Sequence, residues 1–216
     1  MSRPRRRYRS PTRQRQAAET RARILAAARV LLAEQGYAGA TVEAIAQAAD
    51  VAVQTVFAVF GSKRGILAEL LRLAQHAPAA EELRARLRAT DDPAAKVRLA
   101  VAIARRVYEQ MAAGLELLGG AGLVAPELAA VEGEIEARRR AGTGLLADSL
   151  LACGRLRAGL TPEAAADLLW GLTSPDLYRK LVHEQGWTGD AYEYLLGDVL
   201  VDALLTPGRT SGEAVS

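Results

Sequence analysis

The chain has 216 residues, half of them hydrophobic, few aromatic residues and a net charge of +3. This is enough apolar material for a packed core, and the single cysteine, Cys153, excludes an internal disulfide and a cysteine-rich zinc site. No apolar run reaches the roughly 18 residues of a membrane span, and no signal-peptide pattern follows the basic start, so we expect a cytoplasmic protein that does not enter membranes.

The charge is distributed unevenly along the chain. Residues 1–30 contain ten arginines and one acidic residue, Glu19, a net charge of +9, so the remaining residues carry −6. A basic arm on an acidic body is typical of a protein that meets a polyanion such as DNA. We expect residues 1–16 to be a disordered basic arm that also contacts DNA, the alternative being a solvated tail with no ligand.

Apolar residues recur at helical spacing through the first third of the chain, and strand signals are almost absent. Helix boundaries are marked by capping residues and by glycines. The expected helices cover residues 17–35, 41–49, 52–60 and a segment that starts at Ser62. The second and third are short and meet at a tight turn at Asp50 and Val51, which is typical of a helix-turn-helix that reads DNA.

The rest of the chain also shows helical spacing, with proline and a capping residue at several expected starts. The further helices are expected at residues 93–113, 126–153 and 161–184, the last interrupted at Pro175, and from Thr188 to just before Pro207. Pro78 is expected to end or kink the fourth helix. The fold class is therefore all-α.

Residues 21–67 resemble the DNA-binding domain of the tetracycline-repressor (TetR) family. The resemblance rests on short groups in a fixed order: Ile24, Leu25, Ala28 and Leu31; Gly36 and Tyr37; Thr41 and Val42; Ile45 and Ala46; and Phe60, Ser62 and Lys63. It covers about a fifth of the chain.

The chain departs from the family pattern at and after the turn. Asp50 and Gln54 stand where glycine is common, Ala52 replaces serine, Phe57 replaces tyrosine, and Val59 replaces histidine. Because Ala52 and Phe57 have no hydroxyl group, the phosphate contacts that the family makes with serine and tyrosine are in question.

The resemblance implies a domain plan and a mode of action. It implies a helix-turn-helix DNA-binding domain at residues 17–62, an all-helical effector-binding and dimerisation domain at 63–206, and a tail at 207–216 that we expect to be disordered. It also implies a homodimer that binds a palindromic operator in double-stranded DNA and is released by a small-molecule effector of unknown identity.

The residues expected to contact DNA lie at two helix starts and on the third helix. Thr41 and Lys63 are expected to meet phosphates. Gln54 can pair with an adenine edge, and Val53 and Thr55 can contact a thymine methyl group. Phe57 fits either the core or an apolar contact with DNA.

The resemblance also implies an effector pocket between the central helices. Five residues are candidates for its lining, although each also fits ordinary core packing: Tyr108, Met111, Leu146, Trp170 and Tyr178. Arg105 and Arg106 are expected on a solvated face, and Cys153 is expected to be buried or half-buried. No metal ligand set and no cofactor motif occurs, so neither is expected.

The sequence is compatible with two functions. The leading one is a sequence-specific transcription regulator, a repressor in most of the family. The alternative is a ligand-independent architectural or protein-interaction dimer with little sequence preference. An enzyme is not expected, because no paired acid–base motif, nucleophile elbow or phosphate-binding loop is present.

Overall fold

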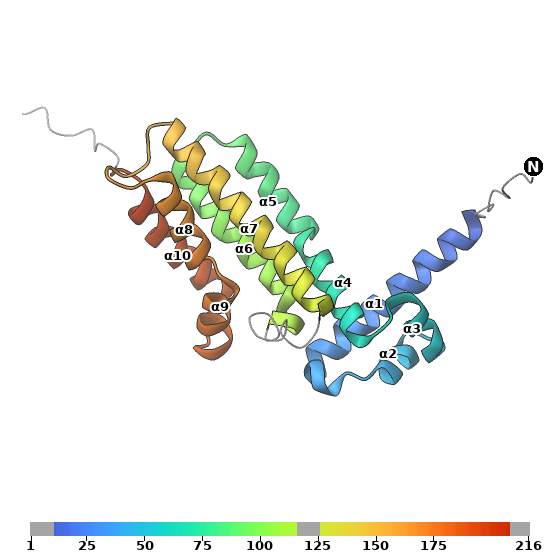
Figure 1. Ribbon diagram of the computed structural model, residues 1–216. Coiled ribbons are helices and arrows are strands. Elements are labelled where there is room, and N and C mark those ends of the chain that lie inside the picture. Colours follow the sequence, from blue (N-terminus) through green and yellow to red (C-terminus); the bar gives the residue numbers. More distant parts are fainter. Residues whose placement is uncertain (1–10, 116–125, 208–216) are drawn as a thin grey trace, which may run out of the picture. The chain divides into compact units, whose positions relative to one another are not determined.

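The computed structural model describes residues 11–115 and 126–207, and the only strand-like feature in these ranges is one antiparallel bridge between Leu156 and Leu205 (Figure 1). The expected all-α fold is confirmed for these residues. The elements are α1 (Pro11–Gly39), α2 (Val42–Ala48), α3 (Val53–Phe60), α4 (Lys63–Gln75), α5 (Pro78–Ala89), α6 (Pro93–Leu115), α7 (Pro126–Ala152), α8 (Pro162–Leu172), α9 (Pro175–Tyr178), the π-helix η2 (Arg179–Glu184) and α10 (Gly189–Leu204). The chain forms two compact units, residues 1–70 and 71–216.

Helix α1 begins earlier than the sequence suggested. Its first residue is Pro11, so residues 11–16, expected in a disordered arm, are helical, while residues 1–10 and the tail from 208 lie outside the described ranges. Proline suits the first helical position, and the arginine, glutamine and alanine residues that follow are good helix formers. Gly36, with φ 67°, breaks the helix where the sequence predicted its end.

The first unit is held together by a small apolar core. Ile24 and Ala28 of α1, Ile45 of α2, Val56 of α3 and Ile66 of α4 are all almost completely buried. Burial of each large aliphatic side chain stabilises the unit by about 1.5–3 kcal/mol.

A polar contact between α1 and α4 supports this core. The guanidinium group of Arg21 lies 2.9 Å from the Glu69 carboxylate and 4.7 Å from the centre of the Phe60 ring. Phe60, expected in the core, is therefore half-buried beneath an arginine.

Five helix starts carry a serine or threonine cap, and all of these but Ser174 were predicted from the sequence. The side chains of Thr41, Ser62, Thr161, Ser174 and Thr188 each accept a hydrogen bond from a backbone N–H three residues later. Each such cap stabilises its helix by about 1 kcal/mol. These caps explain why the helix starts could be located from the sequence.

In the second unit, α6 is the central helix and packs against α5 and α10, while α7 packs against α8 (Figure 1). Buried valines such as Val97, Val101 and Val107 line the inner faces of α6. The buried Tyr108 hydroxyl donates a 2.7 Å hydrogen bond to the carbonyl of Thr173, which ties α6 to the end of α8. Burial raises the pKa of Tyr108, so the phenol stays protonated and remains a donor at neutral pH.

Two side chains of this unit lie otherwise than expected. Arg105 is buried rather than solvated, and its guanidinium group binds the carboxylates of Glu109, Asp190 and Glu193 at 2.6–2.9 Å, which joins α6 to α10. Burial alone would lower the Arg105 pKa, but these hydrogen bonds outweigh it and raise the pKa. Cys153, expected to be at least half-buried, is exposed because it follows the last residue of α7.

Within the described ranges, no single helix is long and apolar enough to cross a membrane. Only α2 and α3 taken together pass that test, and they are bent by 106° at the turn between them.

Gly65 lies close to the backbone at the end of α3. A Cβ atom at this position would lie 2.0 Å from the carbonyl oxygen of Phe60, because Gly61 reverses the chain and brings α4 against the end of α3. We expect Gly65→Ala to lower the free energy of unfolding by about 1–3 kcal/mol, since a backbone atom must move. Urea unfolding followed by circular dichroism measures this.

Gly133→Ala is the control for that substitution. Gly133 is exposed in α7, and a Cβ there meets no atom within 4 Å, so alanine should raise stability by up to about 1 kcal/mol through helix propensity. An equal effect of the two substitutions would contradict the close contact at Gly65.

Candidate nucleic-acid interface and ligand cavity

The turn between α2 and α3 is a left-handed helix cap. Asp50 has φ 51°, and it is the one non-glycine residue with positive φ in the part of the chain that the structure describes. The N–H of Asp50 donates to the carbonyl of Gln47, and the N–H of Val51 donates to the carbonyl of Ala46. This is the hydrogen-bond pattern of a Schellman motif, in which glycine is usual at the left-handed position and aspartate is tolerated.

This turn determines which side chains of α3 are exposed. Val56 is buried against the core, whereas Gln54, Phe57 and Ala58 are exposed on the opposite face. The Phe57 side chain is 47% exposed, so its ring presents apolar surface to solvent beside Gln54. From the sequence, Phe57 fitted either the core or an apolar contact with DNA. Ala58 was not predicted, although it follows Gln54 by four residues and therefore shares its helix face.

Val53 and Thr55 lie at the edges of that face. Both are half-buried, so they flank Gln54 and Phe57. Ala52 is the N-cap residue of α3. Because its side chain has no hydrogen-bond acceptor, the first N–H groups of α3 have no side-chain cap. Thr41 is exposed at the start of α2, and its oxygen accepts the N–H of Ala44 at 3.1 Å, so its O–H can still donate to an anion.

Lys63 has an internal partner that the sequence did not indicate. Its ammonium group donates a 2.6 Å hydrogen bond to the carbonyl of Tyr37 and lies 4.3 Å from the centre of the Tyr37 ring. The ammonium group has three N–H donors, so two remain for an anion. Lys63 thus joins the start of α4 to the last residues of α1, after the break at Gly36, and Arg64 beside it is exposed.

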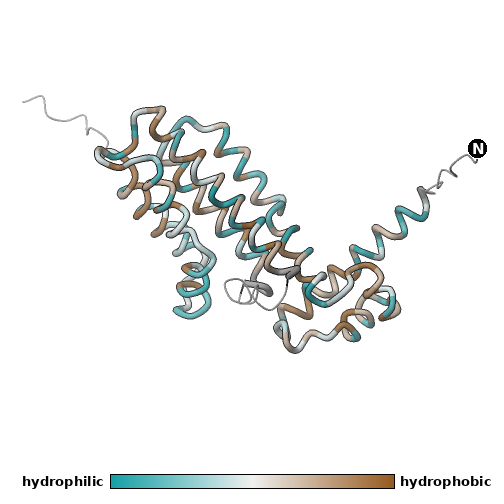
Figure 2. Tube along the Cα trace, in the orientation of Figure 1, coloured by the Kyte–Doolittle hydropathy of each residue, from teal (hydrophilic) through white to brown (hydrophobic). Residues whose placement is uncertain are grey.

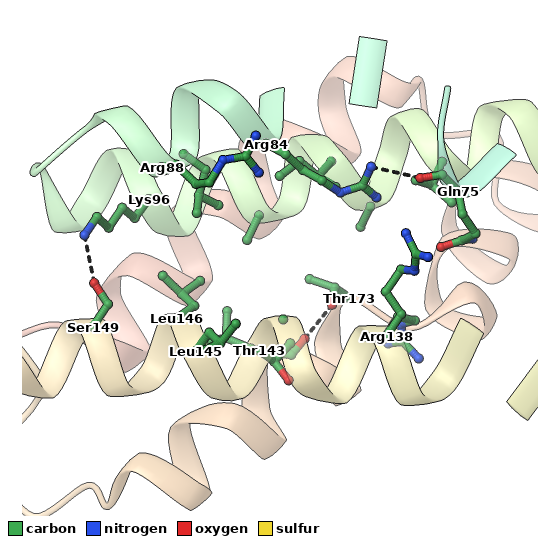
Figure 3. A pocket seen from close by; sticks show the side chains of 18 of the residues that line it. Gln75, Arg84, Arg88, Lys96, Arg138, Thr143, Leu145, Leu146, Ser149 and Thr173 are labelled. Atoms are coloured by element: carbon green, nitrogen blue, oxygen red, sulfur yellow. Dashed lines mark hydrogen bonds between the residues drawn. The ribbon is translucent and has the colours of Figure 1, made fainter. Parts of the chain in front are cut away.

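A cavity of about 500 Å³ lies within the second unit (Figure 3). Its floor is the face of α6 that carries Ala100, Ile103, Ala104, Val107 and Tyr108. One wall comes from α5, the opposite wall from α7 between Arg138 and Ser149, and Leu169, Thr173 and Gln75 complete the lining. This volume and this mostly apolar lining are typical of a small-molecule site.

Only some of the candidate pocket residues line this cavity. Tyr108 and Leu146 line it, but Met111, Trp170 and Tyr178 do not. Met111 accepts a hydrogen bond from Gln75 with its sulfur, and Tyr178 packs its ring 5.4 Å from that of Tyr108.

Trp170 lies outside the lining because charged groups hold it. Its indole N–H donates to Glu136 at 2.7 Å, and the guanidinium groups of Arg139 and Arg140 lie over its ring. Apolar spacing identified residues that face the interior, but it could not separate the core from a cavity wall.

The charged residues that line the cavity were not predicted from the sequence. Lys96 lies on the same face of α6 as Ala100, Ile103 and Val107, at spacings of four, seven and eleven residues. A single charge on an otherwise apolar helix face was the signal that could have identified it. In the ranges that the structure describes, no cluster of histidine, cysteine and acidic side chains is placed to hold a metal ion.

Residues 24–70 match the sequence profile of the family described as bacterial regulatory proteins, tetR family. The match spans the buried positions of α1 through α4 and the turn at Asp50. Among curated proteins, no sequence is similar enough to the chain to count as a relative.

Solved structures resemble the chain over most of its length. NalD of Pseudomonas aeruginosa, described as the secondary repressor of the MexAB-OprM multidrug efflux pump, is 24% identical, with a TM-score of 0.64 over 87% of this chain and 98% of NalD. FadR from Bacillus subtilis, solved with stearoyl-CoA, is 20% identical, with a TM-score of 0.64 over 84% of this chain and 97% of FadR. FadR from Bacillus halodurans, a fatty acid degradation regulator, is 21% identical, with a TM-score of 0.64 over 89% and 96%. At these identities, the likeness establishes the fold.

The left-handed turn can be tested by its tolerance of side chains. We expect Asp50→Val to lower the free energy of unfolding by about 1–2 kcal/mol, because a β-branched residue is strained at positive φ, and Asp50→Gly to cost nothing or to stabilise. Gln47→Val, at an exposed position of α2, should cost only a few tenths of a kcal/mol. Equal losses for Asp50→Val and Gln47→Val in urea unfolding would contradict the turn geometry.

Proposed function

We propose that the chain is a regulator of the TetR family, which residues 24–70 match, and that it is a sequence-specific DNA-binding transcription repressor that a small molecule releases. The observation that carries this proposal is the exposed face of α3, where Gln54, Phe57 and Ala58 follow a helix-turn-helix bend of 106°. Two helices at such an angle place the second in the major groove of DNA. A regulator of this kind works beside bacterial DNA, in the cytoplasm.

Base recognition is assigned to the exposed face of α3. The Gln54 amide can donate to N7 and accept from N6 of one adenine, a pairing that only the major groove offers. Phe57 and Ala58 present apolar surface beside it, which suits thymine methyl groups. This contact would also cover the exposed Phe57 ring.

Contacts with the DNA phosphate backbone would fix the position of the protein along the duplex. The uncapped N–H groups at the start of α3, the Thr41 hydroxyl and the free N–H donors of Lys63 are suited to phosphate oxygens. They can take over part of the role of the serine and tyrosine hydroxyls that Ala52 and Phe57 lack. Affinity would then fall steeply as the salt concentration rises.

A homodimer would present two copies of α3 to a palindromic site. The surface of α8 and α10 supports this assembly, because Leu168 on α8 and Leu195 and Val199 on α10 are 37–55% exposed. These helices are neighbours, and apolar positions recur along both (Figures 1 and 2). Such an apolar surface is typical of an interface.

The cavity offers a route for release by an effector. Gln75, the last residue of α4, lines the cavity, donates to the Met111 sulfur and accepts a hydrogen bond from Arg84 at its carbonyl. Lys63 begins the same helix in the other unit. A ligand that binds one position of Gln75 better than another would therefore shift the population of α4 positions. Stearoyl-CoA in the structure of the Bacillus subtilis FadR is consistent with an effector in this fold.

The family is one of regulators rather than enzymes. The competing function is an architectural dimer with little sequence preference, and the experiment below separates the two.

We expect selection from a random duplex pool to enrich a palindrome. Gln54→Ala should change the preferred base at one position of each half-site, at a cost of about 1–3 kcal/mol for the original base. Lys63→Ala should weaken binding to all sequences alike, because it removes a phosphate contact, and its folding should be checked because the bond to Tyr37 is also lost.

Gln35→Ala is the control, since Gln35 is equally exposed but lies at the end of α1. A pool without any enriched motif at moderate salt would overturn the proposed regulator and favour the architectural dimer.

The dimer surface can be tested by single charges. We expect Leu195→Glu and Val199→Glu each to convert a dimer to a monomer, because a carboxylate would be buried without a partner. Analytical ultracentrifugation measures the assembly. Val30→Glu, at a 51% exposed position of α1, should leave the dimer intact. A dimer that survives both α10 substitutions would rule out this surface.

A further inference from the structure

The cavity is long and has an apolar floor. On α6, its lining runs from Lys96 to Tyr108, and on α7 from Arg138 to Ser149, distances of about 16–18 Å along the helices. Between these ends, the floor and the α7 wall carry Ala100, Ile103, Leu146 and Gly142. The shape suits an extended apolar chain rather than a compact molecule.

The charges of the lining all have one sign. Its ionised side chains are four arginines and one lysine, and among the described residues no aspartate or glutamate lines the cavity. Two of these cations have carboxylate partners: Arg84 pairs with Glu81, and Arg139 pairs with Glu136. These two pairs neutralise part of the positive charge.

Lys96 has no such partner. Its ammonium group donates a 2.7 Å hydrogen bond to the Ser149 hydroxyl, and no carboxylate of the described residues lies within ion-pair distance. The bond joins α6 to α7 at one end of the cavity (Figure 3). Two ammonium donors remain, so a half-buried cation faces the cavity with its charge uncompensated.

One further cation, Arg88, lies at this end of the cavity. Lys96 is the fourth residue of α6, and the Asp92 carboxylate caps the start of this helix by accepting the N–H of Ala94 at 3.0 Å. Arg88 lies in the last turn of α5, lines the cavity, and has no ion pair within the described residues. Arg88 and Lys96 flank the short connection between the two helices, residues 90–92, where Asp91 and Asp92 are exposed to solvent.

We propose that the cavity binds an elongated aliphatic carboxylate, with its anionic head at Lys96, Ser149 and Arg88 and its chain along Ala100, Ile103 and Leu146. The proposal rests on the proposed function only in naming this molecule as the class of effector. A carboxylate would complete the hydrogen bonding of Lys96, and the chain would cover the apolar floor. A positively charged amphiphile would meet only cations at both ends.

The test compares three probes of equal chain length on the full chain without DNA: dodecanoate, dodecanol and dodecylammonium. Titration calorimetry at neutral pH, below the concentration at which the probes aggregate, gives each dissociation constant. We expect dodecanoate to bind at least about tenfold more tightly than dodecanol, as a charge-assisted hydrogen bond allows, and dodecylammonium to bind most weakly.

Two pairs of variants locate the head and the chain. Lys96→Met should remove the preference for dodecanoate over dodecanol, while Lys180→Met, at an exposed position outside the lining, should keep it. Gly142→Leu should weaken both probes at least about tenfold, because a Cβ there meets no atom within 4 Å and the side chain would occupy the cavity. Gly133→Leu on the same helix is its control.

The proposal is overturned if dodecanoate does not bind, if dodecanol binds as tightly, or if Lys96→Met keeps the preference. Binding that Gly142→Leu leaves unchanged would also overturn it. Because these titrations contain no DNA, a failure of sequence-specific DNA binding would not affect them. Conversely, a selected duplex that is bound but not released by dodecanoate would leave the ligand class intact and contradict its role as effector.

Discussion

The left-handed turn at Asp50 is the constraint on which the proposed DNA-binding surface depends. It ends α2 and sets α3 at 106° to it, so Val56 points into the core and Gln54 and Phe57 do not. Without this reversal, the same α3 sequence would expose another face. The family uses glycine where this chain has Asp50, and the positive φ of 51° gives the physical reason.

In the second unit, the helices enclose a cavity, and polar contacts join them around its edges. Lys96 donates to Ser149 at one end, Arg84 donates to the backbone carbonyl of Gln75 at the other, and Tyr108 donates to the carbonyl of Thr173 behind the floor. The apolar middle is therefore left open to a ligand. Gln75 also ends α4, the helix whose residues 63–70 belong to the first unit.

Much of the fold could be predicted from the sequence because its signals are local. Caps such as Thr41 and Ser62 and the break at Gly36 depend on neighbouring residues, and apolar spacing identified Val56 as core. The cavity could not be predicted in this way. Its lining depends on how far apart packed helices lie, so the sequence did not indicate that Lys96 lines this cavity and Trp170 lies outside it.

The most direct test of the central claim, that the face of α3 formed by the Asp50 turn binds DNA, is hydrogen–deuterium exchange of the full chain with and without its selected duplex. We predict that the duplex slows exchange most at the starts of α2 and α3, around Thr41 and Gln54. Protection confined to residues 71–216, with α2 and α3 unchanged, would contradict it.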